Sequence, residues 1–397
     1  MKTEDIKAGA ASSLCPTYAR YPLAIARGEG TKLYSPEGRE YTDLLAGIAV
    51  CGLGHSHPEL VETITAQAKK LIHVSNLFYQ EEQIVLARKL LATCHLDRVF
   101  FCNSGAEANE GAIKLARRFM REGRGEDRYE ILTLTGSFHG RTLATLTATG
   151  QDKIKTHFGP LPQGFVTVPF GDLTAMEAAM SDRTAAVLVE MIQGEGGIIP
   201  LPENYALGLA DLCSRRGVLL MIDEIQTGMG RTGKFWAHQH PGLKPDVVTV
   251  AKGLAGGLPI GAVMCTEDVS KGFPPGSHGT TFGGNALVAA VAAKVLDIMA
   301  RDNLCDRAAR LGTWLRERLD GLQAKHPGHI AAVRVHGLMI GIELTHPGAE
   351  VWSALLDKGF ILNLTQDKVL RLLPPLIITQ AELDAFVTAL DTILSQN

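Results

Sequence analysis

Between about residue 60 and residue 300, short apolar runs rich in β-branched residues alternate with longer stretches of helical periodicity. Three of the runs are almost continuously apolar and read AAVLVEMI, VLLMID and DVVTVA. Such runs are typical of strands covered on both faces, and their alternation with helices predicts a mostly parallel sheet. The predicted strands cover Val99–Cys102, Ile131–Thr135, Ala186–Met191, Val218–Asp223, Val247–Ala251 and Ile260–Cys265, and the predicted helices cover Ala106–Met120, Tyr205–Arg216 and Ala286–Ala300.

The pattern changes after about residue 300. A long amphipathic helix is predicted over Asn303–Gln323, and a final helix opens with the capping box TQAE at Thr379. This pattern predicts a smaller α+β unit that follows the large α/β unit. Its short predicted strands cover Val333–Val335, Leu338–Leu344 and Val369–Leu372.

Length and composition narrow the class of protein. At about 150 residues per domain, 397 residues suggest two or three domains. We expect an N-terminal segment (1–55) that joins the small domain or a dimer contact, a large domain (56–300) and a small C-terminal domain (301–397). The 39 Lys+Arg and 42 Asp+Glu give a net charge of −3, which argues against a general nucleic-acid binder. Seven scattered cysteines without C-x-x-C, and no apolar run that could span a bilayer, predict a cytoplasmic enzyme with free thiols.

Two motifs suggest nucleotide or metal binding but are incomplete. Residues 228–233 read GMGRTG, which fits G-x-G-x-x-G, yet the following KFWAHQHPGLKPD has two prolines and no helical period. Phe235 stands where a P-loop needs a hydroxyl for Mg²⁺. The histidine pairs in 55–57 and 326–329 have no H-E-x-x-H motif or cysteine partner. We therefore expect a glycine-rich loop near a ligand or subunit contact, structural histidines and no metal site.

Lys252 and Asp223 each end an apolar strand, which is where ligands bind in open α/β sheets. Lys252 has apolar residues and glycines on both sides, so its ammonium is partly desolvated and its amine becomes a usable nucleophile. Asp223 needs a cation or several donors at a buried strand end. A solvated lysine and a loop-capping aspartate are the ordinary alternatives. Together, however, the two residues suit a Schiff-base lysine and a carboxylate that keeps the pyridine nitrogen of pyridoxal phosphate protonated.

The segment FFCNSGAEANEGAIKLAR supplies a candidate phosphate site. A strand runs into Ser104, Gly105 and Ala106, and a helix follows. Ser104 is a candidate N-cap, and the free N–H groups of the helix start can bind an anion. An ordinary capped helix is the alternative. Because no lysine accompanies it, this site suits the single phosphate of a cofactor better than ATP.

Four further side chains are candidates for stacking or for binding carboxylates. Phe138, in SFHGRT, is either a core residue or stacks on a flat ring, and Arg141 is either a surface cation or a bidentate carboxylate clamp. Arg371 lies among the apolar residues of VLRLLPPL, where a guanidinium needs an anionic partner. Glu195, in EMIQGEGG, is a candidate for that partner.

These segments resemble the class III (ω-amino acid) aminotransferases of the type I pyridoxal-phosphate fold. Within the class, the resemblance is greatest to the enzymes that act on acetylornithine. It implies an α/β fold with a large domain built on a mostly parallel sheet, a smaller α+β domain, pyridoxal 5'-phosphate as cofactor, and a homodimer with shared active sites. The resemblance spans nearly the whole chain and is carried, in family order, by GIAVCGLGHSHP, FFCNSGAEANEGAIKLAR, SFHGRT, EMIQGEGG, IDEIQTGMGRTG, AKGLAGGLPIGA, HGTTFGGN and LRLLPPL.

The resemblance also implies how the cofactor is bound. Lys252 would bond the cofactor covalently and later move a proton. Asp223 would bind the ring nitrogen, Gln226 would bind the phenolic oxygen, and Phe138 would cover one ring face. The phosphate would be held by Ser104, Gly105 and Ala106 and, from the neighbouring subunit, by Thr281.

The implied reaction moves the ω-amino group of N2-acetylornithine to 2-oxoglutarate in two half-reactions, giving N-acetylglutamate semialdehyde and glutamate. Arg141 would hold the α-carboxylate of acetylornithine, and Thr280 would lie near the substrate. Arg371 would hold the α-carboxylate of 2-oxoglutarate, with Glu195 pairing to it when that carboxylate is absent. Ile48 stands where ornithine δ-aminotransferases carry a tyrosine that reads the free α-amino group. This disfavours ornithine and leaves succinylornithine and 4-aminobutyrate as alternatives.

Overall fold

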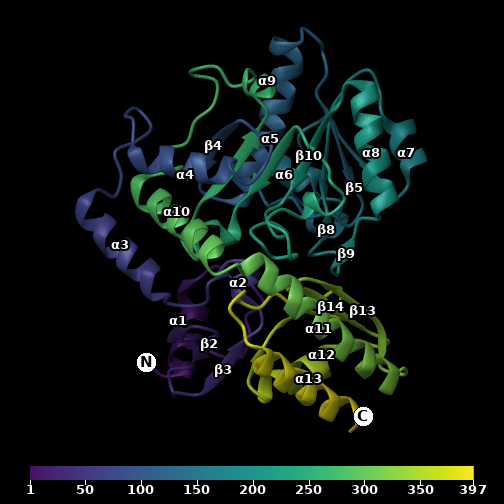
Figure 1. Ribbon diagram of the computed structural model, residues 1–397. Coiled ribbons are helices and arrows are strands. Elements are labelled where there is room, and N and C mark those ends of the chain that lie inside the picture. The colour runs from purple at the N-terminus through teal and green to yellow at the C-terminus, as the bar shows by residue number, and fades with distance from the viewer. Residues whose placement is uncertain (397) are drawn as a thin grey trace.

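A seven-stranded sheet forms the centre of the larger part of the molecule (Figure 1). The computed structural model describes residues 1–396, so Asn397, the last residue of the predicted small domain, lies outside the described residues. In this sheet β12 runs antiparallel to both neighbours and the other pairings are parallel, which confirms the mostly parallel sheet. In sheet order the strands are β4 (Arg98–Cys102), β12 (Gly261–Cys265), β11 (Val247–Val250), β10 (Leu219–Asp223), β7 (Thr184–Glu190), β5 (Glu130–Leu134) and β6 (Phe165–Val168).

Both faces of this sheet are buried. Neighbouring residues of β12 point to opposite faces, since Ala262 belongs to one hydrophobic cluster and Val263 to another. α5 (Gly105–Arg118) adds residues to the Val263 cluster, and α10 (Ala286–Arg301) to the Ala262 cluster. Burial on both faces explains the continuously apolar runs. The other helices of this part are α3 (Pro58–Lys70), α4 (Glu81–Leu91), α6 (Leu143–Ala148), α7 (Leu173–Ala179), α8 (Glu203–Arg216) and α9 (Glu267–Ser270), and the short strands β8 (Ile192–Gln193) and β9 (Ile199–Pro200) form a separate pair.

The C-terminal part is an antiparallel sheet covered by three helices, as the change of pattern after residue 300 predicts. Its last helix begins with the predicted capping box, in which Thr379 Oγ1 accepts from the N–H of Glu382 at 3.2 Å. In sheet order the strands are β13 (Ile330–His336), β14 (Met339–Leu344), β17 (Val369–Leu372) and β16 (Asn363–Thr365), and the helices are α11 (Leu304–Lys325), α12 (Ala349–Asp357) and α13 (Gln380–Leu394). Within residues 1–396, no helix combines the length and the apolar character needed to cross a membrane.

The N-terminal segment is joined to this C-terminal part. Its third strand pairs in parallel with β15 (Phe360–Ile361), through Thr42 with Phe360 and Asp43 with Ile361. Figure 1 shows the purple N-terminal strands and the yellow C-terminal helices at the same end of the molecule. The division into residues 1–55, 56–300 and 301–397 stays a prediction. The elements of the segment are α1 (Thr3–Ser13), β1 (Arg27–Glu29), β2 (Lys32–Tyr34), β3 (Glu40–Asp43) and α2 (Ala46–Ala49).

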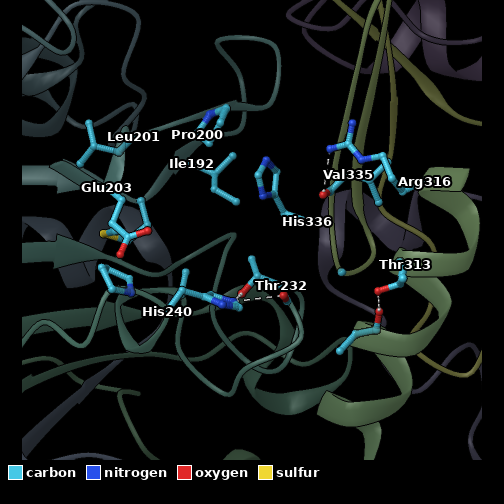
Figure 2. Close-up of a pocket in the computed structure, with 16 residues that line it drawn as sticks. Ile192, Pro200, Leu201, Glu203, Thr232, His240, Thr313, Arg316, Val335 and His336 are labelled. Carbon is cyan, nitrogen blue, oxygen red and sulfur yellow. Dashed lines mark hydrogen bonds between the residues drawn. The ribbon is translucent and has the colours of Figure 1, made fainter. Parts of the chain in front are cut away.

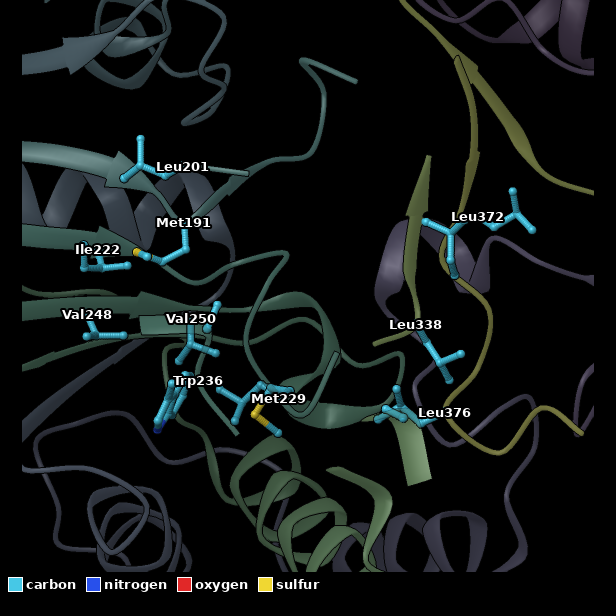
Figure 3. Packing of buried hydrophobic residues seen from close by; sticks show 14 of the residues in the cluster. Met191, Leu201, Ile222, Met229, Trp236, Val248, Val250, Leu338, Leu372 and Leu376 are labelled. Carbon is cyan, nitrogen blue, oxygen red and sulfur yellow. The ribbon is translucent and has the colours of Figure 1, made fainter. Parts of the chain in front are cut away.

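The glycine-rich GMGRTG sequence forms a loop of the large part that packs against the C-terminal part of the molecule. Arg231 is buried, and its Nη1 donates to the carbonyl oxygens of Leu338 at 3.1 Å and Pro374 at 2.5 Å. The Leu338 N–H donates back to the Arg231 carbonyl at 2.9 Å. A Cβ added at Gly337 would lie 2.6 Å from the carbonyl carbon of Thr232, so the close approach requires glycine there. Figure 3 shows Met229 and Leu338, from the two parts, within one hydrophobic cluster. The loop therefore makes its contacts with the C-terminal part of the same chain.

We expect Arg231→Ala to lower the free energy of unfolding by about 3 kcal/mol, because two buried carbonyls lose their donor and a cavity forms. Urea unfolding followed by circular dichroism measures this change. The matched control is Arg215→Ala on the surface of α8, with an expected change within about 0.5 kcal/mol. Equal effects of the two substitutions would show that Arg231 does not stabilise the contact between the two parts.

Candidate active site

A cavity of about 250 Å³ lies where strands β5, β7, β10 and β11 end. Eight of the residues predicted from the sequence line it: Gly105, Ala106, Phe138, Arg141, Glu195, Asp223, Gln226 and Lys252. A larger cavity of about 670 Å³ lies between α8 and the C-terminal strand β13 (Figure 2). Its lining includes Glu203, His240 and His336 and none of the predicted residues. The residues predicted to bind the cofactor and the substrates therefore line the smaller cavity.

Lys252 follows β11 in a strained backbone conformation. Its φ is 41°, in the left-handed region that a lysine rarely adopts. Such strain is retained where the surrounding structure fixes a functional side chain. Burial lowers the pKa of the Lys252 amine, while the nearby carboxylate of Glu195 acts in the opposite direction. An amine of lowered pKa is more often neutral and can act as a nucleophile.

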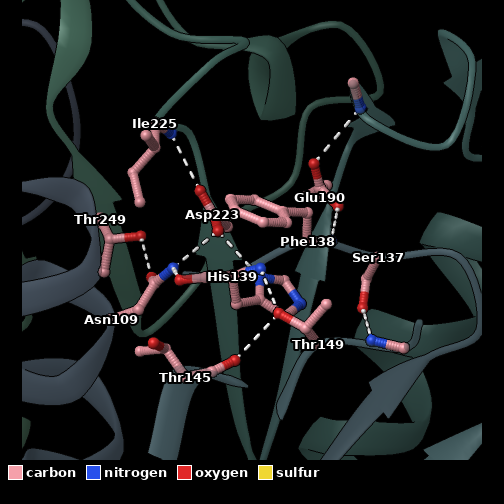
Figure 4. Close-up of polar contacts among 12 residues, drawn as sticks. Asn109, Ser137, Phe138, His139, Thr145, Thr149, Glu190, Asp223, Ile225 and Thr249 are labelled. Carbon is pink, nitrogen blue, oxygen red and sulfur yellow. Dashed lines mark hydrogen bonds and ion pairs between the residues drawn. The ribbon is translucent and has the colours of Figure 1, made fainter. Parts of the chain in front are cut away.

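Asp223 is 3% exposed, and it is held by a set of donors shown in Figure 4. Its Oδ2 accepts from Asn109 Nδ2 at 2.8 Å and lies 2.8 Å from His139 Nδ1, and its Oδ1 accepts from the Ile225 N–H at 3.0 Å. Asn109 Oδ1 in turn accepts from Thr249 Oγ1 at 2.8 Å. These contacts supply the several donors that a buried carboxylate needs.

Two of these supporting residues, Asn109 and His139, were missed by the sequence reasoning. His139 follows Phe138 inside SFHGRT, and Asn109 lies in the helix that follows Ser104. Both motifs were recognised, but nothing in the sequence shows that their side chains turn toward Asp223.

A second carboxyl group, Glu190, lies next to Asp223 on the neighbouring parallel strand. It accepts from the N–H of Phe138 at 2.9 Å and from that of Gly194 at 3.3 Å. Burial raises the pKa of Glu190 to about 7, and the charge of Asp223 acts in the same direction. Besides Glu195, the cavity thus contains one carboxylate surrounded by donors and one carboxyl that readily keeps its proton. The sequence analysis did not identify Glu190.

The first turn of α5 forms one wall of the cavity. Ser104 is its N-cap and accepts from the Glu107 N–H at 3.1 Å. Gly105 and Ala106 follow in the first turn, whose N–H groups have no partner within the helix and suit an anion. A Cβ added at Gly105 would lie 2.9 Å from the side chain of Ile225, so the helix start closely approaches the loop that follows β10.

The predicted pair Arg371 and Glu195 is in contact. Arg371 is 1% exposed, and its Nη1 donates to Glu195 Oε1 at 2.5 Å. Burial acts to raise the pKa of Glu195, but the guanidinium outweighs it and the pKa lies below its ordinary value. Arg371 Nη2 donates to Asn363 Oδ1 at 2.6 Å, and its Nε is buried without a partner. Among the described residues, the Nε–H of Arg371 therefore has no acceptor.

The remaining predicted residues lie at the rim of the site or outside it. Arg141 lines the cavity, with its guanidinium 5.5 Å from the centre of the Phe138 ring. Thr280 Oγ1 accepts from Asn103 Nδ2 at 3.0 Å, just before α5. Thr281 is exposed and does not line the cavity.

The cavity fits pyridoxal 5'-phosphate. Gln226 Oε1 and His139 Nε2 are buried polar atoms that have no partner among the described residues. A Cβ added at Gly194 would lie 2.0 Å from Gln226 Oε1, so only glycine leaves room for that side chain. An amine, a buried carboxylate and a helix start at one cavity match the aldehyde, the ring nitrogen and the phosphate of this cofactor. Residues 1–396 contain no group of three or more His, Cys, Asp or Glu side chains placed to hold a metal ion.

The raised pKa of Glu190 predicts a pH effect on stability. The folded protein keeps a proton on Glu190 up to about pH 7, whereas the unfolded chain releases it near the ordinary value of 4.5. Glu190 therefore makes the free energy of unfolding fall as the pH rises from 4.5 to 7. We expect Glu190→Gln to remove this contribution, so that wild type loses stability relative to the variant across this range. Urea unfolding of the cofactor-free proteins measures it, and a pH-independent difference would contradict the assignment.

Comparison with known proteins gives one consistent result. The family Aminotransferase class-III matches residues 15–394. The chain is 46% identical to an acetylornithine aminotransferase from Myxococcus xanthus, over 96% of each chain, and 45% identical to one from Methanocaldococcus jannaschii, over 96% of this chain and 95% of the other. The structure of ornithine aminotransferase from Toxoplasma gondii matches with a TM-score of 0.95 at 33% identity, over 98% of this chain and 94% of that one. Acetylornithine aminotransferase from Elizabethkingia anophelis matches over the whole of both chains, with a TM-score of 0.91 and 33% identity. The chain belongs to the class III aminotransferases and is a pyridoxal-phosphate-dependent transaminase.

Proposed function

We propose that this transaminase moves the ω-amino group of N2-acetylornithine to 2-oxoglutarate, giving N-acetylglutamate semialdehyde and glutamate. The observation that carries this proposal is the agreement among relatives. Those from Myxococcus xanthus, Methanocaldococcus jannaschii and Rhodobacter capsulatus are 45–47% identical over nearly the whole chain, and each is an acetylornithine aminotransferase. The cavity supports it with two arginines that suit carboxylate-bearing substrates, Arg141 at its rim and Arg371 behind Glu195.

In this proposal, the residues around the cofactor ring hold charge and move one proton. Bound pyridoxal phosphate supplies a conjugated ring that accepts electrons from the carbon bearing the amino group. Asp223, held by Asn109 and His139, keeps a negative charge at the ring nitrogen. The amine of Lys252, with its lowered pKa, takes the proton from the substrate carbon and returns it to the cofactor side. Phe138 covers one ring face, and Gln226 binds the phenolic oxygen.

The two substrates differ in where they carry carboxylates, and the ion pair of Arg371 suits that difference. With acetylornithine bound, Arg141 holds its α-carboxylate and Glu195 stays on Arg371. With 2-oxoglutarate bound, its α-carboxylate replaces Glu195 on Arg371. A carboxylate that displaces Glu195 takes over the Nη1 donor that Glu195 leaves, and the charge of the guanidinium strengthens that contact. One site thus orients two substrates of different shape.

The position of Ile48 supports an acylated substrate over free ornithine. Ala46, Gly47, Ile48 and Ala49 all have left-handed φ values, between 50° and 65°, which is costly for a β-branched residue. This turn lies beside the catalytic loop, since a Cβ added at Gly253 would lie 3.6 Å from the Ala49 carbonyl. Ile48 is 37% exposed and has no hydrogen-bonding group for a free α-amino group.

The surface supports a homodimer with shared active sites. Leu77, Phe78 and Tyr79 form an exposed apolar segment, 64–105% exposed, and Phe282 beside Thr281 is 58% exposed. Asn76 Nδ2, next to this segment, donates to the carbonyls of Thr280 and Gly283, so the two loops are neighbours. A second copy that covers this patch would bury its aromatic side chains. In this arrangement Thr281 reaches the phosphate of the neighbouring subunit.

The seven cysteines support placement in the cytoplasm. All seven are free thiols, and three of them are buried. An unpaired, odd set of thiols is typical of a reducing compartment.

Lys252→Ala should reduce transamination at least about 1,000-fold, because the proton transfer loses its base. The fold should persist, as measured by circular dichroism and thermal unfolding. In wild type, borohydride reduction followed by mass spectrometry should place the cofactor on the peptide that contains Lys252. The exposed Lys271→Ala is the matched control and should retain wild-type rates. A Lys252→Ala enzyme with full activity would refute the proton-transfer role.

A substrate panel tests the proposed donor. We expect kcat/KM for acetylornithine to exceed that for ornithine and for 4-aminobutyrate by at least about tenfold. Ornithine has a free α-amino group that Ile48 cannot bind, and 4-aminobutyrate lacks the α-carboxylate that Arg141 would hold. Initial rates with 2-oxoglutarate as acceptor, measured by glutamate formation, give the values. If succinylornithine or 4-aminobutyrate reacts faster, that compound replaces acetylornithine as the substrate.

A further inference from the structure

Arg371 has two partners of different kinds. Asn363 lies directly opposite it on the neighbouring antiparallel strand β16, and its Oδ1 accepts from Arg371 Nη2 at 2.6 Å. Glu195, in the loop after β8, accepts from Nη1 at 2.5 Å. The first partner is neutral and fixed in a sheet register. The second is an anion on a loop.

Contacts behind Asn363 fix which way its amide points. The Tyr21 hydroxyl donates its single proton to the carbonyl of Leu362 at 3.0 Å. It can therefore only accept from Asn363, whose Nδ2 lies 3.2 Å away. Trp352 donates to the same Leu362 carbonyl at 2.9 Å and packs edge-on against Tyr21, with 4.8 Å between ring centres. Because the amide nitrogen faces Tyr21, the amide oxygen must face Arg371.

The same hairpin also holds the backbone of Glu195. Gln366, in the turn between β16 and β17, donates through Nε2 to the Glu195 carbonyl at 2.7 Å. The main chain of Glu195 is thus tied to the strands that carry Asn363 and Arg371. An exchange of partners on Arg371 then requires only the Glu195 side chain to move.

The neutrality of Asn363 matters for binding an anion. Asn363 occupies one edge of the guanidinium without cancelling its charge, so the full charge is available to whichever carboxylate takes the other edge. An aspartate at this position would give Arg371 a permanent anionic partner and weaken its attraction for a substrate carboxylate.

We propose that Asn363 is a positioning residue that keeps Arg371 aimed into the site while Glu195 and the α-carboxylate of 2-oxoglutarate or glutamate exchange on its other edge. This inference rests on the proposed role of Arg371 in binding that carboxylate. It assigns Asn363 to the half-reaction with 2-oxoglutarate or glutamate, because Glu195 stays on Arg371 in the half-reaction with acetylornithine.

The test follows each half-reaction of the holoenzyme separately, through the change in cofactor absorbance, with L-glutamate or with acetylornithine. For Asn363→Asp we expect the half-saturating concentration of glutamate to rise at least about tenfold, with the acetylornithine value within about twofold of wild type. The dissociation constant of glutarate, an unreactive dicarboxylate, should rise by a similar factor in calorimetry. Arg371→Ala is the positive reference, and Thr365→Ser on the same strand is the matched control and should match wild type.

Asn363→Ala is a second variant, in case the aspartate impairs folding. It should also raise the half-saturating concentration of glutamate and the dissociation constant of glutarate, because Arg371 loses its fixed partner. If both variants have the same half-saturating glutamate concentration and the same glutarate affinity as wild type, the inference is overturned. Equal damage to both half-reactions would overturn it as well, since it would mark Asn363 as structural only. If wild type reacts with glutamate but not with acetylornithine, the proposed donor is wrong, and the glutamate arm still tests Asn363.

Discussion

The hydrogen bonds that hold a buried carboxylate at the end of β10 are the interaction on which the site depends. An amide, an imidazole and a backbone N–H point at the two oxygens of Asp223. Each of these donors comes from a different element, so the central sheet, α5 and the loop after β5 must be assembled before the carboxylate is stabilised. Glu190, one strand away, accepts from two backbone N–H groups, but burial still raises its pKa to about 7. The strand order thus places two carboxyl groups side by side in different surroundings.

The C-terminal hairpin is joined to the cavity through Glu195, which lines it. Its strands carry Arg371 and Asn363, and its turn holds the loop of Glu195. In the proposed function, the cofactor contacts therefore come mainly from the large sheet, and the exchangeable carboxylate contact comes from the smaller part. Arg231 joins the two parts through buried hydrogen bonds. In this way a loop that resembles a nucleotide motif in sequence serves the contact between the two halves of the site.

Much of the fold could be predicted because burial on both faces of a sheet leaves continuous apolar runs. β10 and β11 lie within the predicted strands, and β7 overlaps its predicted strand but begins two residues earlier, at Thr184. The N-terminal strands β1–β3 were missed because each has only three or four residues and no alternation of apolar and polar positions. Lys252 and Asp223 could be identified from their places at strand ends. Asn363 could not, because its importance arises from a pairing register with Arg371 and from Tyr21, which is 342 residues away along the chain.

The pairing of β3 with β15 has a consequence for synthesis of the chain. Asp43 meets Ile361, so 361 − 43 = 318 residues separate the two partners in sequence. During translation, the first strands leave the ribosome long before their hydrogen-bonding partner exists, and their open edge must wait while the large sheet forms. Closing a loop of this length is slow, so the half of the active site that carries Arg371 becomes complete only at the end of folding. A nascent chain can therefore bury its large sheet early and still lack a finished substrate site until the last strands are added.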